Sequence, residues 1–190
     1  MVNIGFVCEG KTEQDIIESA SFQEWLYRNG LTCVSPVFDV AGSGNLLPHR
    51  MTDIRETLFR NGASVIVVIT DLDQDECITI TRERVTNQNN QVVIVAVQQI
   101  ESWFLGDTIT LRRLFSDDTF EFNNPEAEQN PFATLKHLFK LKTQRGIGTK
   151  PMLARRMLKY GFTIENAARH PNCSSANYFL TKLQTLASAN

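Results

Sequence analysis

The sequence predicts an α/β fold in which a parallel sheet is flanked by helices. Three hydrophobic runs, at residues 2–8, 65–70 and 91–97, are rich in β-branched side chains. Continuous runs of this kind are typical of strands that are buried on both faces of a parallel sheet. Segments with helical spacing lie between them, and such alternation is the pattern of a sheet that is covered by helices.

The first half of the chain supplies the strands and the helices that connect them. The strand at 2–8 leads into a helix that we expect over 11–29, where Gly30 ends it. The segment 32–40 is a further strand, and Pro36 favours an edge position or irregular pairing because proline has no amide hydrogen to donate. The other elements are expected in this order: loop 41–45, helix 46–60, strand 65–70, helix 79–87 and strand 91–97.

After the last strand the pattern changes to helices and loops. A short helix is expected at 111–115, and an acidic loop follows at 117–131. Helices at 131–142 and 150–160 are basic and amphipathic. The segment 144–149 contains two glycines and is expected to form the turn between these two helices.

The chain ends in one more expected helix, at 174–187. Ser174 or Ser175 is the expected N-cap, because a serine hydroxyl can accept a hydrogen bond from an amide of the first turn. We therefore expect two parts: a core at 1–110 that carries the sheet, and a helical, basic extension at 111–190 that packs on this core.

The net charge of −2 conceals a strong asymmetry. Residues 1–135 hold 9 Lys or Arg and 20 Asp or Glu, a net charge of −11, whereas residues 136–190 hold 10 Lys or Arg and one acid, a net charge of +9. A basic segment of this kind favours a polyanionic partner. The alternative is that the two parts attract and neutralise each other.

Composition also excludes some classes of protein. No apolar run approaches the roughly 18–20 residues of a membrane span, so we expect no membrane partner. The chain enters a strand at once, so no secretory signal is expected. The four cysteines are scattered without C-x-x-C spacing, which favours reduced thiols and a cytoplasmic protein over a zinc site.

Carboxylates stand at the ends of two of the predicted strands. Glu9 follows the first strand, and Asp71 and Asp73 follow the strand at 65–70. In open α/β sheets, ligands bind outside the carboxyl ends of the strands, so these three side chains should converge at one edge. Clustered carboxylates repel unless a cation holds them, and hard oxygen ligands suit Mg²⁺ or Mn²⁺. The alternative for the two aspartates is that they only cap the next helix.

Three further acids are candidates for the same site. Glu13 lies one helical turn beyond Glu9, where it either faces the site or is solvated. Asp75 is a candidate outer metal ligand. Glu101 follows a buried strand and is either a fourth site residue or a helix cap.

Residues 5–12 match the phosphate-binding pattern G-x-x-x-x-G-K-[ST], with Lys11 as its lysine. A true P-loop needs a full strand before its first glycine and an open loop around phosphate. Here only four residues precede Gly5, and residues 6–8 continue the hydrophobic run. We therefore expect residues 6–8 to pair in the sheet. A nucleoside triphosphatase that uses Lys11 is the third alternative for the function.

The order of these motifs resembles that of the Toprim superfamily, in which one strand ends in Glu-Gly and a later strand ends in Asp-x-Asp. Glu9-Gly10 and Asp71-Leu72-Asp73 match this pattern. Residues 9–13, 71–75, 101–107 and 173–179 are similar to the small bacterial Toprim-like proteins called domain of unknown function 4276. The resemblance implies a Toprim-like, Rossmann-like sheet and a metal site in residues 1–110.

The resemblance also bears on the C-terminal part and on the biological setting. Related OLD-type nucleases use a lysine from their C-terminal part, which makes Lys150 a catalytic candidate. Related proteins occur in phage-defence systems beside an ATPase, so the resemblance implies a bacterial defence role and a partner ATPase.

Several residues are candidates for contact with phosphate. Gly10 makes the close turn into the first helix, and a glycine-rich loop follows the second strand. The basic helix at 150–160 carries two adjacent arginines, which face either solvent or a polyanion. The candidates for phosphate or nucleic-acid binding are Gly10, Gly42, Ser43, Gly44, Arg155 and Arg156.

Taken together, these observations predict a Mg²⁺-dependent nuclease that acts on DNA or RNA. Asp71 and Asp73 would hold the metal, which lowers the pKa of a bound water. Glu9 would act as a general acid or base or as a further ligand. The alternative is a non-catalytic module that binds Mg²⁺ and regulates or scaffolds a partner.

Overall fold

A computed structural model describes residues 1–85 and 88–188 of the chain. Its centre is one parallel sheet of four strands in the order β2-β1-β3-β4. The strands are β1 (Val2–Cys8), β2 (Leu31–Asp39), β3 (Val65–Asp71) and β4 (Gln91–Ala96). Every residue of β3 is buried, as the continuous hydrophobic run predicts. The expected α/β class is therefore confirmed.

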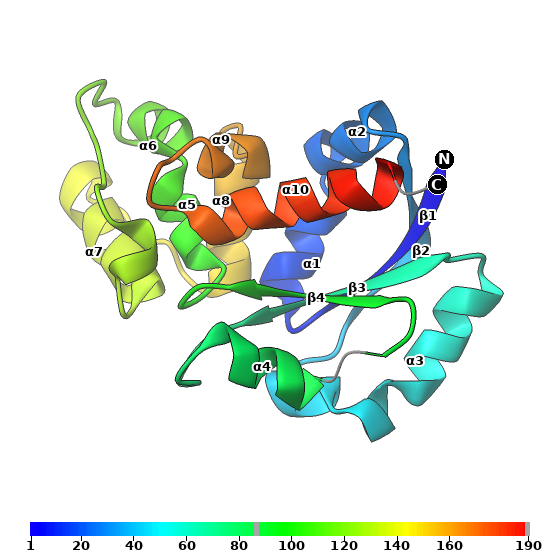
Figure 1. Ribbon diagram of the computed structural model, residues 1–190. Helices are drawn as coiled ribbons and strands as arrows, with labels where there is room; N and C mark the ends of the chain where they lie inside the picture. Colours follow the sequence, from blue (N-terminus) through cyan, green and yellow to red (C-terminus); the bar gives the residue numbers. More distant parts are fainter. Residues whose placement is uncertain (86–87, 189–190) are drawn as a thin grey trace.

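Helices cover both faces of the sheet (Figure 1). The chain passes from β1 to β2 through α1 (Lys11–Ile17) and α2 (Ala20–Arg28) on one face. It returns to β3 through α3 (Pro48–Arg60) on the other face, where α4 (Ile78–Val85) also lies. The connections after β1 and β3 thus leave the sheet on opposite faces. This makes the β1/β3 boundary a topological switch point, where ligands of open α/β sheets bind.

The register of β1 tests two expectations: that residues 6–8 pair in the sheet, and that Pro36 makes the pairing of its strand irregular. Phe6, Val7 and Cys8 pair with Val67, Val68 and Ile69 of β3, so these residues lie in the sheet ladder as expected. On the other side, Gly5 pairs with Val34 and Val7 with Phe38, so the register shifts within β2 around Pro36. β2 is also an edge strand, and both consequences expected from Pro36 are confirmed.

The helix expected over 11–29 is two helices. α1 ends at Ile17 and α2 begins at Ala20. Ser19 stands between them in an extended conformation, and its Oγ accepts a hydrogen bond from the amide of Phe22 at 3.3 Å. The prediction of one helix was wrong because the apolar spacing runs on across a serine that caps the second helix.

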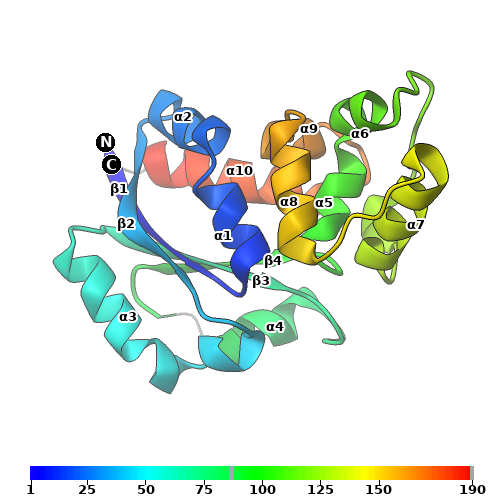
Figure 2. The ribbon, with the colours of Figure 1, turned by 180° about the vertical axis from the view of Figure 1, so that it is seen from behind.

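The C-terminal part is a layer of helices on the face that carries α1 and α2. Figure 2 shows α8 beside α1, and α10 lies across the same face of the sheet. Side chains from both halves of the chain form one hydrophobic cluster, which includes Phe22, Trp103 and Phe179. The helices are α5 (Glu101–Gly106), α6 (Thr108–Phe115), α7 (Pro131–Thr143), α8 (Lys150–Lys159), α9 (Ile164–Ala168) and α10 (Ser174–Ser188).

Two short helices were not expected from the sequence. α5 follows β4 directly and brings Trp103 and Phe104 into the core, where they are 1% and 0% exposed. α9 has only five residues, and Thr163 caps it by accepting a hydrogen bond from the amide of Asn166. Single turns of this length carry little periodic signal, so the hydrophobic spacing does not reveal them.

The start of α10 corrects the expected cap. Ser174 is already the first helical residue, and the carboxylate of Glu126 accepts from the amides of Ser174 and Ser175 at 3.0 and 2.7 Å. The hydroxyl of Ser175 instead accepts from the indole of Trp103 at 2.7 Å and from the amide of Val97. A distant acid caps this helix, and the serine joins α10 to α5 and β4.

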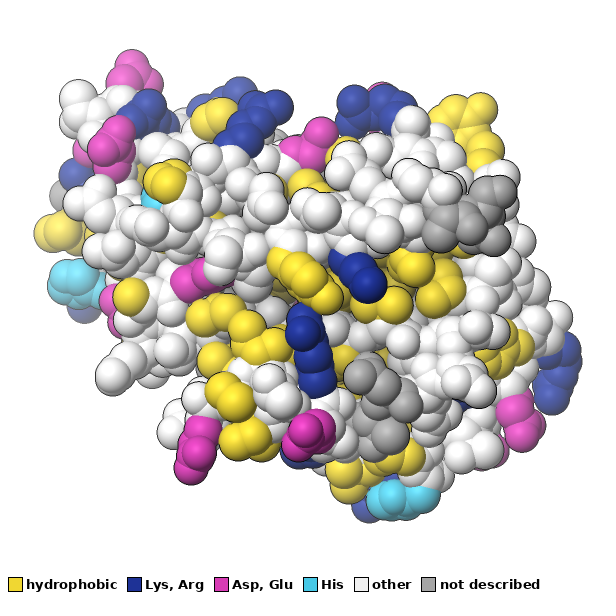
Figure 3. Space-filling view, in the orientation of Figure 1, with side chains coloured by type: hydrophobic (Ala, Val, Ile, Leu, Met, Phe, Trp, Pro, Cys, Tyr) yellow, Lys and Arg dark blue, Asp and Glu magenta, His cyan; other side chains and the backbone are white. Residues whose placement is uncertain are grey.

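The face shown in Figure 3 contains β4, the second edge strand of the sheet. Hydrophobic side chains gather across the middle of this face, with basic side chains among them. Arg82 of α4 lies over the ring of Tyr178 of α10, 5.0 Å from its centroid.

The helix expected over 79–87 corresponds to α4, Ile78–Val85. Residues 86–87 of that prediction lie outside the described residues. No helix among the described residues is long and apolar enough to cross a bilayer.

Candidate functional site

A cleft with a volume of about 370 Å³ opens at the carboxyl ends of β1 and β3. It lies at the topological switch point, and its lining residues come from the turn after β1, the ends of β2 and β3, the loop after β2, and helices α1, α5 and α8. We call it the carboxylate cleft. Seven of the residues expected from the sequence line it: Glu9, Gly10, Glu13, Gly42, Asp71, Glu101 and Lys150.

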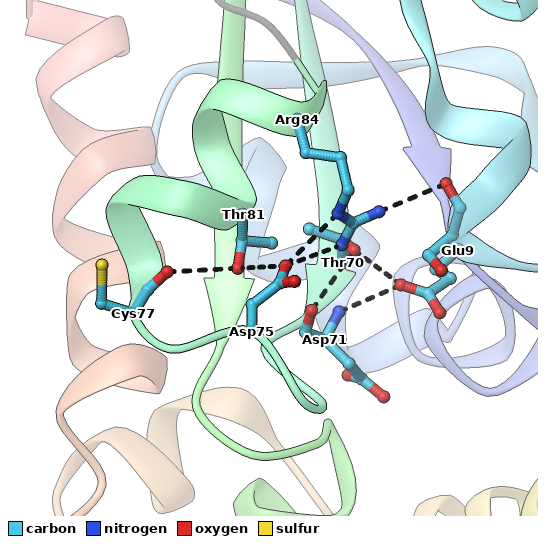
Figure 4. Close-up of polar contacts among 8 residues, drawn as sticks. Glu9, Thr70, Asp71, Asp75, Cys77, Thr81 and Arg84 are labelled. Carbon is cyan, nitrogen blue, oxygen red and sulfur yellow. Dashed lines mark hydrogen bonds and ion pairs between the residues drawn. The ribbon is translucent and has the colours of Figure 1, made fainter.

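Glu9 stands directly after β1 and is tied to the end of β3. Its Oε2 accepts from the hydroxyl of Thr70 at 2.6 Å and from the amide of Asp71 at 3.2 Å (Figure 4). The amide of Glu9 donates to the carbonyl of Ile69, which continues the ladder between the two strands. Glu9 and Asp71 are therefore neighbours, as the parallel sheet predicts.

Asp71 is the last residue of β3 and is only 6% exposed. Its Oδ1 accepts from the amide of Ile100 at 2.8 Å, which fixes the start of α5 against β3. Burial raises the pKa of Asp71 well above its usual value, and the nearby charges of Glu13, Glu101 and Glu9 raise it further. The carboxyl group thus binds a proton or a cation more readily than an exposed aspartate does.

Glu13 projects into the same cleft from the first turn of α1 and is 5% exposed. Burial, with repulsion from Glu101 and Glu9, raises the pKa of Glu13 to about 7. Gly10 leaves room for this side chain, because a Cβ at that position would lie 3.3 Å from Glu13 Oε2. The short turn and the glycine together explain how Glu9 and Glu13 come to share one cleft.

Glu101 and Lys150 form an ion pair in the wall of the cleft. Among the described residues, no other two residues that line the cleft pair in this way. Lys150 Nζ lies 3.0 Å from Glu101 Oε2, and the Glu101 side chain is fully buried. Burial raises the pKa of Glu101 even though Lys150 opposes the shift. For Lys150, burial opposes the charge, but attraction to Glu101, Asp71 and Glu13 outweighs it and raises the pKa of the amine.

The position of Lys150 in its helix supports a role in this cluster. It is the first residue of α8, and a cation there is opposed by the positive end of the helix dipole. The carboxylates of the cleft offset that cost. The sequence suggested Lys150 only through a resemblance, and the structure places its amine against Glu101.

The donor set of the cleft fits a hard divalent cation. Five carboxylates and two lysines line the cleft, and the buried Oε1 of Glu101 has no hydrogen-bond partner among the described residues. An orphaned buried acceptor beside protonatable acids is the kind of site in which Mg²⁺ or Mn²⁺ compensates charge. Within residues 1–85 and 88–188, however, no three acidic, histidine or cysteine side chains are already arranged to hold an ion. Glu9 Oε2 instead bonds to Thr70 and Asp71 at the end of β3, and Asp71 Oδ1 bonds to the amide of Ile100 at the start of α5.

Asp73 and Asp75 lie outside the cleft. Asp73 is exposed in a turn with a φ of 47°, and its Oδ1 accepts from Gln99 Nε2 at 3.1 Å. Asp75 pairs with Arg84 at 3.2 Å and accepts from the hydroxyl of Thr81 at 2.8 Å (Figure 4). These contacts lower the pKa of Asp75, the bond from Thr81 first. Asp75 thus fastens α4 in the described structure.

The glycine-rich loop after β2 contributes only its first part to the cleft. Gly42 lines the cleft, and its amide donates to the carbonyl of Glu9 at 2.8 Å. Its φ of 123° belongs to the region that favours glycine, so this approach depends on the missing side chain. Ser43 and Gly44 do not line the cleft and begin a short 3₁₀ helix, Ser43–Leu46. Arg84 donates to the carbonyl of Ser43 and links this turn to Asp75.

Lys11 lies at the rim of the cleft but is engaged locally. Its Nζ lies 3.0 Å from Asp15 Oδ1 and 2.8 Å from Gln14 Oε1. Because residues 6–8 lie in the sheet ladder, they do not form an open loop around a phosphate. The letters of the P-loop pattern are therefore present without its backbone geometry.

The two arginines of α8 have different surroundings. Arg155 pairs with Asp15 of α1 at 3.0 Å, whereas Arg156 lies over the ring of Phe139 and donates to the carbonyl of Gly146. Lys142 pairs with Asp117 at 2.9 Å. Internal pairing thus neutralises part of the charge asymmetry, as the alternative reading of that asymmetry anticipated.

Sequence reasoning missed the residues that position the acids. Thr70 donates to Glu9, Gln99 holds Asp73, and Asp39 joins the cleft from the end of β2. Thr70 and Asp39 each carry a signal, because they are polar residues at the carboxyl end of a parallel strand, the edge of the sheet where ligands bind. Asp107, from the motif at 101–107, is a buried cap of α6 that accepts from the amide of Thr110.

Comparison of the chain with protein-family models, with curated proteins and with solved structures finds no significant match.

Proposed function

We propose that this protein is a Mg²⁺-dependent phosphodiesterase that acts on nucleic acid, with the carboxylate cleft as its active site. The observation that carries the proposal is the gathering of Glu9, Glu13, Asp71 and Glu101 around Lys150 at the switch point. Buried acids with raised pKa values in a cleft are characteristic of functional sites, because stability alone gives no reason to cluster them.

Each of these side chains has a role in the proposed reaction. Asp71, Glu13 and Glu101 would hold Mg²⁺ or Mn²⁺, which supplies Lewis acidity toward a phosphate oxygen. Of the two carboxylate oxygens of Glu9, only Oε2 accepts a hydrogen bond within the described chain, so Oε1 can take a proton from an attacking water. Lys150 offers its amine to the negative charge that develops on the phosphate. Asp73, which lies outside the cleft, would join as an outer ligand.

The order of motifs supports the same reading. The Glu-Gly at β1 and the Asp-x-Asp at β3 resemble the Toprim pattern, and the topology brings Glu9 beside Asp71. By that resemblance the protein would act in the bacterial cytoplasm in phage defence, beside a partner ATPase. The substrate would be DNA or RNA, because the proposed chemistry acts on the phosphate that both share.

A second candidate is a non-catalytic module that binds Mg²⁺ and regulates a partner. It is favoured by the finding that no three ligands are already arranged for an ion among the described residues. Such a cleft would bind the cation and lack the fixed geometry that catalysis needs. Cation binding without cleavage would support this candidate and contradict the phosphodiesterase.

The test is cleavage of labelled single- and double-stranded DNA and RNA with Mg²⁺, with Mn²⁺ and with a chelator. We expect cleavage only with a cation, and a loss of at least about 10²-fold in Glu9→Gln and Asp71→Asn. Glu24→Gln is the matched control, because Glu24 is an exposed acid outside the cleft. Cation-independent cleavage, or equal activity in all three variants, would refute the proposal.

A parallel assay tests the third alternative, a nucleoside triphosphatase that uses Lys11. ATP hydrolysis by the purified protein should be absent, and Lys11→Ala should leave cleavage of nucleic acid unchanged apart from local effects of its pair with Asp15. ATP binding that Lys11→Ala abolishes would restore the P-loop interpretation despite the ladder at residues 6–8.

A further inference from the structure

A second hollow, of about 220 Å³, lies between α6, α7 and α8, away from the carboxylate cleft. Its charged lining is purely positive: two guanidinium groups and no carboxylate. We call it the arginine hollow. Its lining residues are Leu114, Phe139, Thr143, Arg145, Arg156 and Tyr160.

No ion pair neutralises the two arginines within the described part of the chain. Arg145 is exposed in the turn between α7 and α8, and neither it nor Arg156 has an acidic partner among the described residues. This differs from Lys142, Lys150 and Arg155, each of which pairs with an acid. Two of the basic side chains of the C-terminal part that have no ion pair among the described residues therefore meet at this hollow.

Arg156 is held in place before any ligand arrives. Its guanidinium lies over the ring of Phe139, 5.6 Å from the centroid, and Nη1 donates to the carbonyl of Gly146 at 3.2 Å. That bond also fixes the turn that carries Arg145. A third guanidinium, that of Arg113, donates to the carbonyl of Tyr160 at 3.5 Å. Arg113 does not line the hollow, so an anion there would meet one guanidinium, that of Arg156, whose position is already restrained.

The chemistry of the lining selects a particular class of anion. Guanidinium groups bind phosphate oxygens through paired N–H donors, and they do so better than lysine. Tyr160 is 44% exposed, and an exposed aromatic residue beside cations is a stacking surface for a nucleobase. Phosphate and base together describe a nucleotide.

We infer that the arginine hollow binds one nucleotide, with its phosphate at Arg145 and Arg156 and its base against Tyr160. The ligand is either a free mononucleotide or one unit of a nucleic-acid strand. Lys150 and Arg156 lie six residues apart on α8, which is about 9 Å along the helix axis. The two side chains point about 120° apart around that axis, so a strand in the carboxylate cleft would pass around α8 to reach the hollow, a placement that rests on the proposed function.

The test measures binding in the presence of a chelator, so that it does not depend on cation binding or cleavage. The probes are a labelled single-stranded oligonucleotide, followed by fluorescence anisotropy, and adenosine monophosphate, followed by calorimetry. Arg145→Ala should weaken binding of the oligonucleotide about tenfold and reduce the salt slope by about 0.7. Arg169→Ala is the matched control, because Arg169 is an exposed arginine of the same half that does not line the hollow.

Arg145 is chosen because it lies in an exposed turn, so its removal should leave the melting temperature unchanged. Dependence on Arg145 for both probes would mean that the hollow accepts a free nucleotide. Dependence for the oligonucleotide alone would mean that it holds a unit of a strand. If Arg145→Ala and Arg169→Ala bind both probes alike, the inference is wrong. A protein that binds through Arg145 but never cleaves would retain this site and lose the proposed function.

Discussion

The carboxylate cleft and the arginine hollow are both built on α8, yet they hold their charges in opposite ways. In the cleft, Glu13, Asp71 and Glu101 are 5%, 6% and 0% exposed. In the hollow, Arg145 is exposed and water screens its charge. Burial makes like charges costly, so the cleft should respond strongly to pH and cations. The hollow should respond to salt and hardly to pH.

The largest expected effect is the loss of stability as the cleft ionises. The pKa of Glu13 is raised from 4.5 to about 7, so the folded state binds its proton more tightly than the unfolded state does. The stabilisation is complete below about pH 4.5 and is lost as the pH rises to about 7. The free energy of unfolding should fall by up to about 3 kcal/mol over this range, measured by chemical denaturation.

Two variants test whether this pH dependence of stability arises in the cleft. Glu13→Gln should flatten it, because the amide cannot ionise, whereas Glu24→Gln should not. The pKa values of Asp71 and Glu101 are shifted in the same direction, so some dependence should remain in Glu13→Gln. Saturating Mg²⁺ should reduce the fall if the cation binds the ionised acids. Equal pH dependence in the wild type and Glu13→Gln would show that these acids are not coupled to folding.

The next effect comes from breaking the pair between Lys150 and Glu101. Lys150→Met should leave a fully buried carboxylate without its cation and lower the free energy of unfolding by about 2 kcal/mol near neutral pH. This is less than for a fully buried pair, because the Lys150 side chain is 38% exposed. Adding Glu101→Gln to Lys150→Met should recover most of the loss. A double variant that is no more stable than Lys150→Met would contradict this account.

A smaller effect is expected from the pair between Arg155 and Asp15. The Arg155 side chain is 64% exposed, so Arg155→Ala should cost roughly 0.2–1 kcal/mol and should cost less at high salt. Its effect on the salt slope of oligonucleotide binding should be smaller than that of Arg145→Ala, because Arg155 is already paired. An equal effect of the two variants would place the nucleic acid along the whole of α8.

The smallest change in stability is expected from Asp73→Asn, within about 0.5 kcal/mol. Asparagine tolerates the φ of 47°, and its Oδ1 can still accept the bond from Gln99. Cleavage should fall less than in Asp71→Asn, because Asp73 does not line the cleft. A loss as large as that of Asp71→Asn would mean that Asp73 moves into the cleft when the cation binds.

Much of the fold could be predicted because it depends on local hydrophobic patterns. The runs at β1, β3 and β4 fill the centre of the sheet, and Pro36 indicated the irregular edge strand β2. The prediction was wrong where a local signal interrupted the pattern, as at Ser19, or where an element was too short to show one, as at α9. Propensity and spacing are averages over several residues, so single capping contacts escape them.

The candidate site was predictable in outline. Glu9 and Asp71 end adjacent parallel strands, and this alone brings them together. The sequence could not separate Asp71 from Asp73, because both follow the same strand within two residues. The turn at Asp73 directs its carboxylate to Gln99, while Asp71 bonds to the amide of Ile100. That difference depends on how β4 and α5 continue the chain, which local sequence does not reveal.

The sequence by itself determined the parallel sheet, the helices on its two faces and the acids at the ends of β1 and β3. These follow from hydrophobic periodicity and from the direction of strands. Only the tertiary structure decided that Lys150 meets Glu101, that Asp75 pairs with Arg84 and that Arg145 and Arg156 share a hollow. Each of these meetings joins segments brought together by packing, and burial then decides which charges are costly and which remain available to a ligand.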